Sequence, residues 1–293
     1  MAARIALALA VLAPFTTGCV YSTESGAITD RMVSDWEGTK ESEEGSWQGE
    51  PIIITADMGG IHVEGVEGKT NISITTRFVA GANSQEEAQP AYEDVAAGLQ
   101  IELLNGTWYV SCPHAKEKHG IVVPSTTGCE NLFVRVPTGS VEQPIDLTSK
   151  TTAGGSTAEK IVVSRLSLHA PFGVLAQVTP VVGADIEVYN EDLDSGDCPA
   201  ELYLPQDFAT DLYDLSIQRA DLKRYDGEPL KINTSAFPDL TSPLGSRGAP
   251  GTGASRIVVR ASIGDVTLGT GALPKIDKEG IHNCQNLDLE FEL

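Results

Sequence analysis

Alternating apolar and polar residues dominate the chain from Pro51 onward. In the stretch NISITT, Ile72 and Ile74 fall on one face of an extended strand, whereas Ser73 and Thr75 fall on the other. Such runs of β-branched and aromatic residues are typical of strands. Comparable runs are PIIITA, LQIELL, GTWYVSC, NLFVRVP, PIDLTS, EKIVVSRLSLHA, GVLAQVTPVVGADIEVYN, AELYLP, ATDLYDLSI, SRIVVRASIGDVTLGTG and NLDLEFEL. The pattern predicts one all-β domain over 51–293.

A single helix is predicted over 84–97. Ser84 followed by Glu87 is the arrangement of a capping box, which satisfies backbone N–H groups at the start of a helix. Pro90 lies beyond the first turn, so we expect it to kink the helix. The apolar residues spaced to share one face are Ala88, Tyr92, Val95, Ala96 and Leu99.

An internal repeat indicates stacked strands. FVRVPTGSVEQPIDLTS (133–149) and ELYLPQDFATDLYDLSI (201–217) align without gaps at an offset of 68 residues. Each copy reads as a strand that ends at a proline, then a turn, then a second short strand. Duplicated units of this kind occur where neighbouring strands stack in coils or layers, although two copies do not define a regular period.

The first 50 residues differ from the rest of the chain. Arg4 precedes an apolar stretch over 5–15, which is too short to cross a bilayer because a crossing helix needs about 20 residues. A basic residue, a short apolar core and small residues after it are typical of a secretion signal, so we expect residues 1–18 to be removed. Residues 22–50 are polar and acidic without clear periodicity, and we expect a flexible tether over 19–50.

Thr17, Gly18 and Cys19 resemble the end of a bacterial lipoprotein signal, although Thr16 stands where leucine is commoner. The resemblance implies that Cys19 receives a diacylglyceryl group, with a further acyl chain such as palmitate on its freed amine. Lipid on Cys19 would hold the protein in a membrane of the cell envelope, the outer membrane rather than the inner. The alternative is an ordinary secreted protein that keeps Cys19 as a free thiol.

Four of the five cysteines remain for disulfides, and four cysteines allow three pairings. Cys112 and Cys129 flank a loop with His114 and His119, so these four residues could also bind zinc. A disulfide is favoured, because an exported protein folds where disulfides persist. The predicted bridges are Cys112–Cys129 and, by elimination, Cys198–Cys284.

Removal of residues 1–18 changes the net charge from −21 to −22, because Arg4 is lost. Nucleic acid and anionic lipid surfaces repel a chain this acidic, which argues against both as binding partners. Carboxylates are so abundant that no pair stands out as catalytic, and we expect most of them on a solvated surface.

The segment NEDLDSGDCPAE (190–201) carries side-chain oxygens at its first, third, fifth and twelfth positions, which is the spacing of a calcium-binding loop. However, glycine falls one position late, at Gly196, and strands rather than helices flank the segment. An acidic turn without an ion is the alternative. The candidate calcium ligands are Asn190, Asp192, Asp194 and Glu201.

The sequence contains no nucleophile elbow, Walker sequence or H-E-x-x-H motif. The histidines are scattered along the chain. His62 and His169 alternate with apolar neighbours in predicted strands, so we expect both on the protein surface. No catalytic residue is predicted.

Several of these segments resemble the bacterial putative-adhesin family of uncharacterised proteins. GGIHVEGVEGKTNISITTRFVAG, the helix and LQIELLNGTWYVSC are similar to its opening part, and VRVPTG, LYLPQD and IVVRASIGDVTL to its later part. The resemblance covers most of 51–271, whereas the cysteines and the segment 113–128 depart from it. It implies a β-solenoid-like or stacked-sheet domain without established catalytic residues.

The predicted function is that of a lipid-anchored cell-envelope protein whose non-catalytic β domain serves binding, adhesion or envelope structure. Its ligand would be an envelope or extracellular molecule, either a polysaccharide or a protein. The alternative is a carbohydrate-active enzyme, a lyase or hydrolase, on the same scaffold. A deep groove with two close, buried carboxylates would favour the enzyme.

Overall fold

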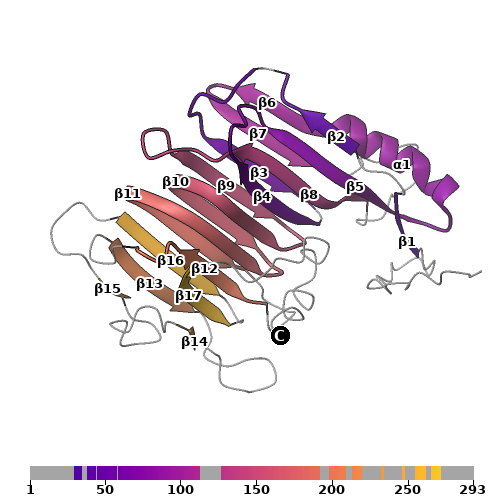
Figure 1. Ribbon diagram of the computed structural model, residues 1–293. Helices are drawn as coiled ribbons and strands as arrows, with labels where there is room; N and C mark the ends of the chain where they lie inside the picture. The colour runs from indigo at the N-terminus through magenta and orange to yellow at the C-terminus, as the bar shows by residue number, and fades with distance from the viewer. Residues whose placement is uncertain are drawn as a thin grey trace, which may run out of the picture.

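The computed structural model describes residues 30–34, 38–43, 45–57, 59–112, 127–191, 198–208, 213–219, 232–233, 246–247, 255–261 and 265–271. These residues form seventeen strands and one helix, α1, so the prediction of an all-β domain with a single helix is confirmed. The strands form a long row, and α1 lies beside β5 at one end of it (Figure 1). No helix in the described residues has the length and apolar character that a membrane crossing requires.

The elements before residue 113 are β1 (Asp30–Val33), β2 (Gly38–Glu41), β3 (Ile52–Ala56), β4 (Gly60–Val66), β5 (Ser73–Ala82), α1 (Gln85–Gly98), β6 (Gln100–Leu104) and β7 (Thr107–Cys112). Those after it are β8 (Gly128–Pro137), β9 (Ile145–Thr151), β10 (Ser156–Ala170), β11 (Val174–Asn190), β12 (Ala200–Leu204), β13 (Tyr213–Arg219), β14 (Ile232–Asn233), β15 (Ser246–Arg247), β16 (Ser255–Ala261) and β17 (Val266–Thr270).

The strands pair in two ladders. The first ladder runs β5, β8, β4, the first part of β10, the first part of β11, β12, β17 and β14. The second runs β6, β7, β3, β9, the second part of β10, the second part of β11, β16, β13 and β15. Interior pairs are parallel, and antiparallel β5, β6 and β15 flank them. From β7 to β15 the chain alternates between the two ladders, as in a β-solenoid, and two successive strands, one in each ladder, make one coil.

The order of the coils in space differs from their order in the chain. The coil β3–β4 lies between β7–β8 and β9–β10, so an early segment is inserted between two later ones. Likewise, β16–β17 lies between β11–β12 and β13–β14. The stack is therefore interlocked at two places.

The core consists of the inward-facing residues of both ladders. In β3 and β4, Ile52, Ile54, Ile61 and Val63 are completely buried, and the residues between them face outward. The internal repeat predicted the local architecture correctly. Its first copy gives β8 and β9, its second gives β12 and β13, and each copy passes from the first ladder to the second.

Backbone hydrogen bonds connect successive corners of the stack. A residue at the start of a strand in the first ladder, either the first or the second, donates its N–H to the carbonyl just before the neighbouring strand, in four consecutive steps. These bonds run from Ile61 to Gly155, Ser156 to Gly173, Val174 to Pro199 and Ala200 to Asp265, over 2.9–3.0 Å. Each bond joins one corner to the next, so a continuous row of backbone hydrogen bonds runs along the corners of the stack.

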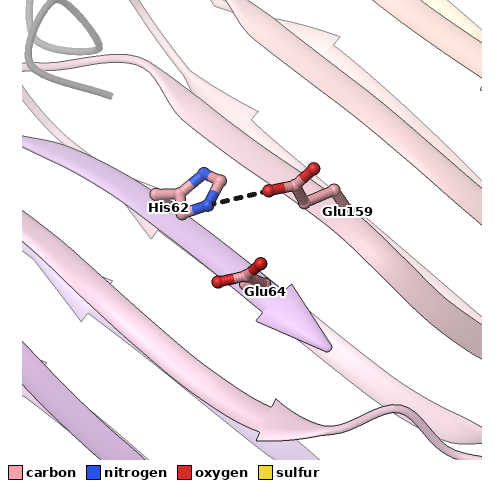
Figure 2. A group of neighbouring side chains, drawn as sticks. All are labelled: His62, Glu64 and Glu159. Atoms are coloured by element: carbon pink, nitrogen blue, oxygen red, sulfur yellow. Dashed lines mark ion pairs between the residues drawn. The ribbon is translucent and has the colours of Figure 1, made fainter. Parts of the chain in front are cut away.

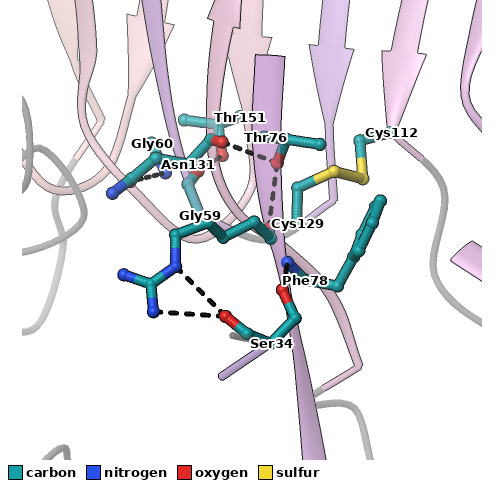
Figure 3. Close-up of a disulfide and its surroundings, with 10 residues drawn as sticks. Ser34, Gly59, Gly60, Thr76, Phe78, Cys112, Cys129, Asn131 and Thr151 are labelled. Atoms are coloured by element: carbon teal, nitrogen blue, oxygen red, sulfur yellow. Dashed lines mark hydrogen bonds between the residues drawn. A yellow bond between two sulfur atoms is a disulfide. The ribbon is translucent and has the colours of Figure 1, made fainter. Parts of the chain in front are cut away.

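Buried polar side chains form hydrogen bonds with further backbone groups at the corners (Figure 3). The Asn131 side-chain oxygen accepts from the N–H of Gly60 over 3.1 Å, and the Thr151 hydroxyl donates to the carbonyl of Gly59 over 2.8 Å. Gly59 and Gly154 approach so closely that a Cβ added to Gly154 would lie 2.0 Å from the Gly59 oxygen. Glycine at position 154 is therefore required by contact between two corners.

The predicted tether needs correction from Asp30 onward. β1 and β2 pair antiparallel with β5 along the edge that β8 leaves open. Trp47 is 7% exposed, and its Nε1–H donates to the carbonyl of Glu50 over 2.7 Å. This polar segment joins the fold for two reasons. The edge of β5 offers unpaired N–H and C=O groups, and Trp47 has a large apolar surface to bury. Residues 1–29, with Cys19, lie outside the described residues.

The helix matches its predicted cap and face. The Ser84 hydroxyl accepts from the N–H of Glu87 over 3.2 Å, and Ala88, Tyr92 and Val95 are buried against the sheet. The Glu87 carboxylate accepts from the N–H of Asn83 over 3.0 Å, one residue before the position expected in a capping box.

Candidate functional site

A charged cluster lies on the outer face of the first ladder, where β4 and β10 run side by side. His62 and Glu64 alternate with the buried Ile61 and Val63 of β4, so both point away from the core. In the parallel register of the two strands, Thr157 lies beside His62, and Glu159 lies beside Glu64. Figure 2 shows the three titratable side chains on one face, with the His62 ring directed at Glu159.

His62 is buried, which contradicts the prediction of a surface histidine. Its side chain is 2% exposed. The Phe133 ring of β8 lies edge-on at 6.1 Å on one side, and on the other the Thr157 hydroxyl of β10 lies 2.6 Å from Nδ1. Alternation correctly placed His62 on the outer face, but side chains of two neighbouring strands cover it. Sequence periodicity within one strand carries no signal for such coverage.

The second ring nitrogen of His62 faces carboxylates. Nε2 lies 3.3 Å from Oε1 of Glu159, yet it is buried and makes no hydrogen bond. Glu159 and Glu64 are 13% and 19% exposed. Two like charges side by side on adjacent strands repel each other, and partial burial weakens the screening by water. The pair therefore requires positive charge close by.

Lys160 supplies part of that charge. Its Nζ lies 2.7 Å from Oε1 of Glu64 and 3.8 Å from Oε1 of Glu159. Hydrogen bonding to the Glu64 carboxylate, reinforced by the charges of both glutamates, raises the pKa of Lys160, so its ammonium stays charged. Arg135 is more distant, with Nε 3.9 Å from Glu64.

A bulge in β10 places Lys160 beside the acidic pair. Lys160 has a φ of +59°, and the pairing register shifts there, between Glu159 and Ile161. The bulge pushes the carbonyl of Lys160 toward β4, where a Cβ on Gly65 would lie 2.1 Å from that oxygen. Glycine at position 65 thus permits the bulge that brings Lys160 into the cluster.

An open groove adjoins the cluster on the Lys160 side. Its volume is about 660 Å³, and Trp47 and the backbone of Gly68 and Gly139 line part of it. Lys160 also lines a smaller cavity of about 300 Å³, together with Gln177 and Gln206. The polar side chains of the larger groove are Glu67, Lys69, Thr70, Thr138, Ser140, Gln143 and Lys160.

The predicted disulfide Cys112–Cys129 is present, with both cysteines buried and their Cα atoms 6.2 Å apart (Figure 3). These sulfur atoms are bonded to each other, so the alternative zinc site does not form. His114 and His119 lie outside the described residues. Cys198 is buried and disulfide-bonded, and Cys284, its predicted partner, lies outside the described residues.

The structure describes two of the four predicted calcium ligands. Asn190 is buried at the end of β11, and its amide Nδ2 donates to the carbonyl of Cys198. The Glu201 carboxylate accepts from the Tyr203 hydroxyl over 2.9 Å. Asp192 and Asp194 lie outside the described residues, so calcium binding by this loop stays a prediction.

His169 provides a contrast to His62. Its Nδ1 lies 2.9 Å from Oε1 of Glu191, and Lys150 lies 3.8 Å from the same carboxylate. The His169 side chain is 24% exposed. Within the described residues, the group of three metal-ligand side chains with ligand atoms all within 4.8 Å of one another is that of His62, Glu64 and Glu159.

No protein-family model and no curated protein matches the chain. Among solved structures, a "putative cell adhesion protein" from Clostridium sporogenes is 11% identical, with a TM-score of 0.45, over 80% of this chain and 99% of that one. A "putative adhesin" from Bacteroides fragilis is 10% identical, with a TM-score of 0.25, over 81% and 98%. A "putative lipid binding protein" from Parabacteroides distasonis is 10% identical, with a TM-score of 0.29, over 62% and 70%. At these identities the comparisons assign the chain to no family.

Proposed function

We propose that the protein is a lipid-anchored component of the cell envelope whose β domain binds a polysaccharide without transforming it. The observation that carries this proposal is the open groove beside Lys160. Hydroxyl, amide and ammonium groups and the Glu67 carboxylate line it together with glycine backbone, and such groups form hydrogen bonds to sugar hydroxyls. A long stack of parallel strands holds these groups on a rigid platform.

The arrangement of carboxylates supports binding over glycoside hydrolysis. Glu64 and Glu159 lie close together, as the two acids of such enzymes do. However, the Glu64 carboxylate forms an ion pair with the Lys160 ammonium, and the His62 ring lies against the Glu159 carboxylate. Neither carboxylate projects into the groove as a general acid must, since the groove is lined by Lys160 and by residues beyond it.

Filling the groove tests this proposal. Gln143→Trp places a large side chain at the groove wall, and we expect it to weaken binding of purified envelope polysaccharide by at least about tenfold, because the sugar can no longer enter. Val141→Trp is the matched control, because Val141 is 70% exposed in the same turn but does not line the groove. Binding is measured by co-sedimentation or calorimetry. Equal affinities of the two variants would contradict a role for the groove.

Anchoring by Cys19 is tested separately. We expect Cys19→Ala to abolish incorporation of labelled fatty acid and to move the protein from the membrane fraction to the soluble fraction, because a lipid chain would be its attachment to the bilayer. Cys19→Ser serves as a second variant that also lacks the thiol. Fatty-acid labelling that persists in both variants would refute lipid attachment at this residue.

A further inference from the structure

The cluster of His62, Glu64 and Glu159 contains an unsatisfied buried nitrogen. Nδ1 of His62 is engaged by the Thr157 hydroxyl at 2.6 Å, whereas Nε2 is buried without a hydrogen bond. Buried polar atoms of this kind are uncommon in folded proteins, and each calls for a partner. Here the unsatisfied atom points at the two carboxylates.

A neutral imidazole alone does not explain this contact. If Nδ1 donates its hydrogen to Thr157, the lone pair of Nε2 faces the lone pairs of a Glu159 oxygen 3.3 Å away, which is repulsive. If Nε2 carries the hydrogen, that hydrogen is not shared with Glu159, because the contact lacks hydrogen-bond geometry. A positive centre between the nitrogen and the carboxylates satisfies all three groups.

We propose that His62, Glu64 and Glu159 bind a divalent transition metal, and that Zn²⁺ fits this ligand set best. Zinc accepts imidazole nitrogen and carboxylate oxygen at about 2.0–2.1 Å in tetrahedral geometry, which places neighbouring ligand atoms about 3.3 Å apart. The observed distance between His62 Nε2 and Glu159 Oε1 is 3.3 Å, and the three ligand atoms lie within 4.8 Å of one another. Water would take the fourth position, on the open side.

The surroundings of His62 match those of a metal ligand. A metal-bound histidine usually donates its other ring N–H to an oxygen, which fixes the ring and makes the bound nitrogen more basic. Thr157, itself buried, provides that oxygen for Nδ1, and Phe133 holds the ring from the other side. One imidazole among two carboxylates favours zinc over calcium or magnesium, which prefer oxygen ligands throughout.

Lys160 acts as the counter-ion of the metal-free site. Its side chain is 56% exposed, so the ammonium can leave Glu64 for water when a metal arrives. The metal and Lys160 therefore compete for the same carboxylate. This competition gives the proposal a signature that a purely structural ion pair lacks, since removal of Lys160 should strengthen metal binding.

The test uses the full chain, stripped with a chelator and titrated with Zn²⁺ by calorimetry. We expect one Zn²⁺ per chain at this site, weakened at least about tenfold by His62→Gln or Glu159→Gln, because each removes one of three ligands. Lys160→Asn, which keeps a residue that tolerates positive φ, should bind Zn²⁺ more tightly. His169→Gln is the matched control and should leave the affinity unchanged. With Co²⁺ in place of Zn²⁺, the visible absorption of the site should be weaker in Glu159→Gln than in the parent chain at the same Co²⁺ concentration.

Each outcome decides the question. Zinc affinity that is equal in Glu159→Gln, His62→Gln and the parent chain overturns the proposal, as does a chain that binds no zinc. Weaker binding in Lys160→Asn also overturns it, because Lys160 would then support the site. If His62→Gln fails to fold by circular dichroism, the isosteric and partly exposed Glu159→Gln keeps the test valid. The groove variants address the sugar site separately, so failure of either proposal leaves the other standing.

Discussion

Alanine at position 154 is expected to lower the free energy of unfolding by about 3 kcal/mol, the upper end of the cost of overpacking. The added Cβ would lie 2.0 Å from the carbonyl oxygen of Gly59 and 2.3 Å from its carbon. No rotation of a side chain relieves such a contact, because the Cβ is fixed to its own backbone and the atoms it meets are backbone atoms. The two corners must move apart, and the corner hydrogen bonds on either side stretch with them. Thermal unfolding should then occur about 10 °C lower.

Gly183→Ala is the control for this experiment. Gly183 has a φ of +92°, but no atom lies within 4 Å of the position that a Cβ would take. Its substitution therefore costs the strain of a left-handed backbone alone, about 1–2 kcal/mol. A melting temperature of Gly154→Ala at or above that of Gly183→Ala would show that the corners are not in contact in solution.

Removal of the Cys112–Cys129 bridge should have a comparable effect. The bond closes a loop between positions 17 residues apart, and a loop of that size stabilises a fold by about 3 kcal/mol in the chain-entropy model. We expect the double variant Cys112→Ala, Cys129→Ala to lose this stabilisation in chemical denaturation. The end of β7 and the start of β8 should lose protection in hydrogen exchange, because these are the strands that the bridge joins.

The double variant separates this bridge from the one at Cys198. Reduction of the whole protein would open both bridges, whereas the double variant leaves Cys198 untouched. The double variant should also be compared with Cys112→Ala alone, which removes the bridge but leaves a free thiol at position 129. Midpoints of unfolding equal to that of the parent chain in both variants would refute the expected contribution.

Much of the fold could be predicted because it is local. Alternation in NISITT correctly placed Ile72 and Ile74 in the core, and the cap at Ser84 correctly marked the start of α1. The 68-residue repeat gave the strand–corner–strand unit. The Cys112–Cys129 bond followed from short spacing. Each of these predictions depends on the pattern within a short segment, on the similarity of two such segments, or on a short spacing between two cysteines.

The remaining features depend on contacts between distant segments. The strands β1 and β2 join the sheet because β5 offers an open edge, and no residue within 30–50 indicates that this edge exists. The burial of His62 depends on residues 71 and 95 positions later, Phe133 and Thr157. The φ of +59° at Lys160 is adopted by a residue type with no preference for it, so the bulge that assembles the charged cluster has no sequence signature.

The interlocked order of the coils also governs how the protein can be synthesised. β3 pairs with β7 and β9, so Ile52 must meet Trp108 and Leu147, which are made 56 and 95 residues later. Contacts of such long range slow folding, because a large loop must close before any of them forms. As the chain leaves the ribosome, the apolar strand IIITA has no partner until β7 is complete at residue 112, and it lacks its second partner until residue 151 has followed it. We therefore expect chaperones to bind this strand during synthesis, and a delayed or truncated chain to aggregate through it first.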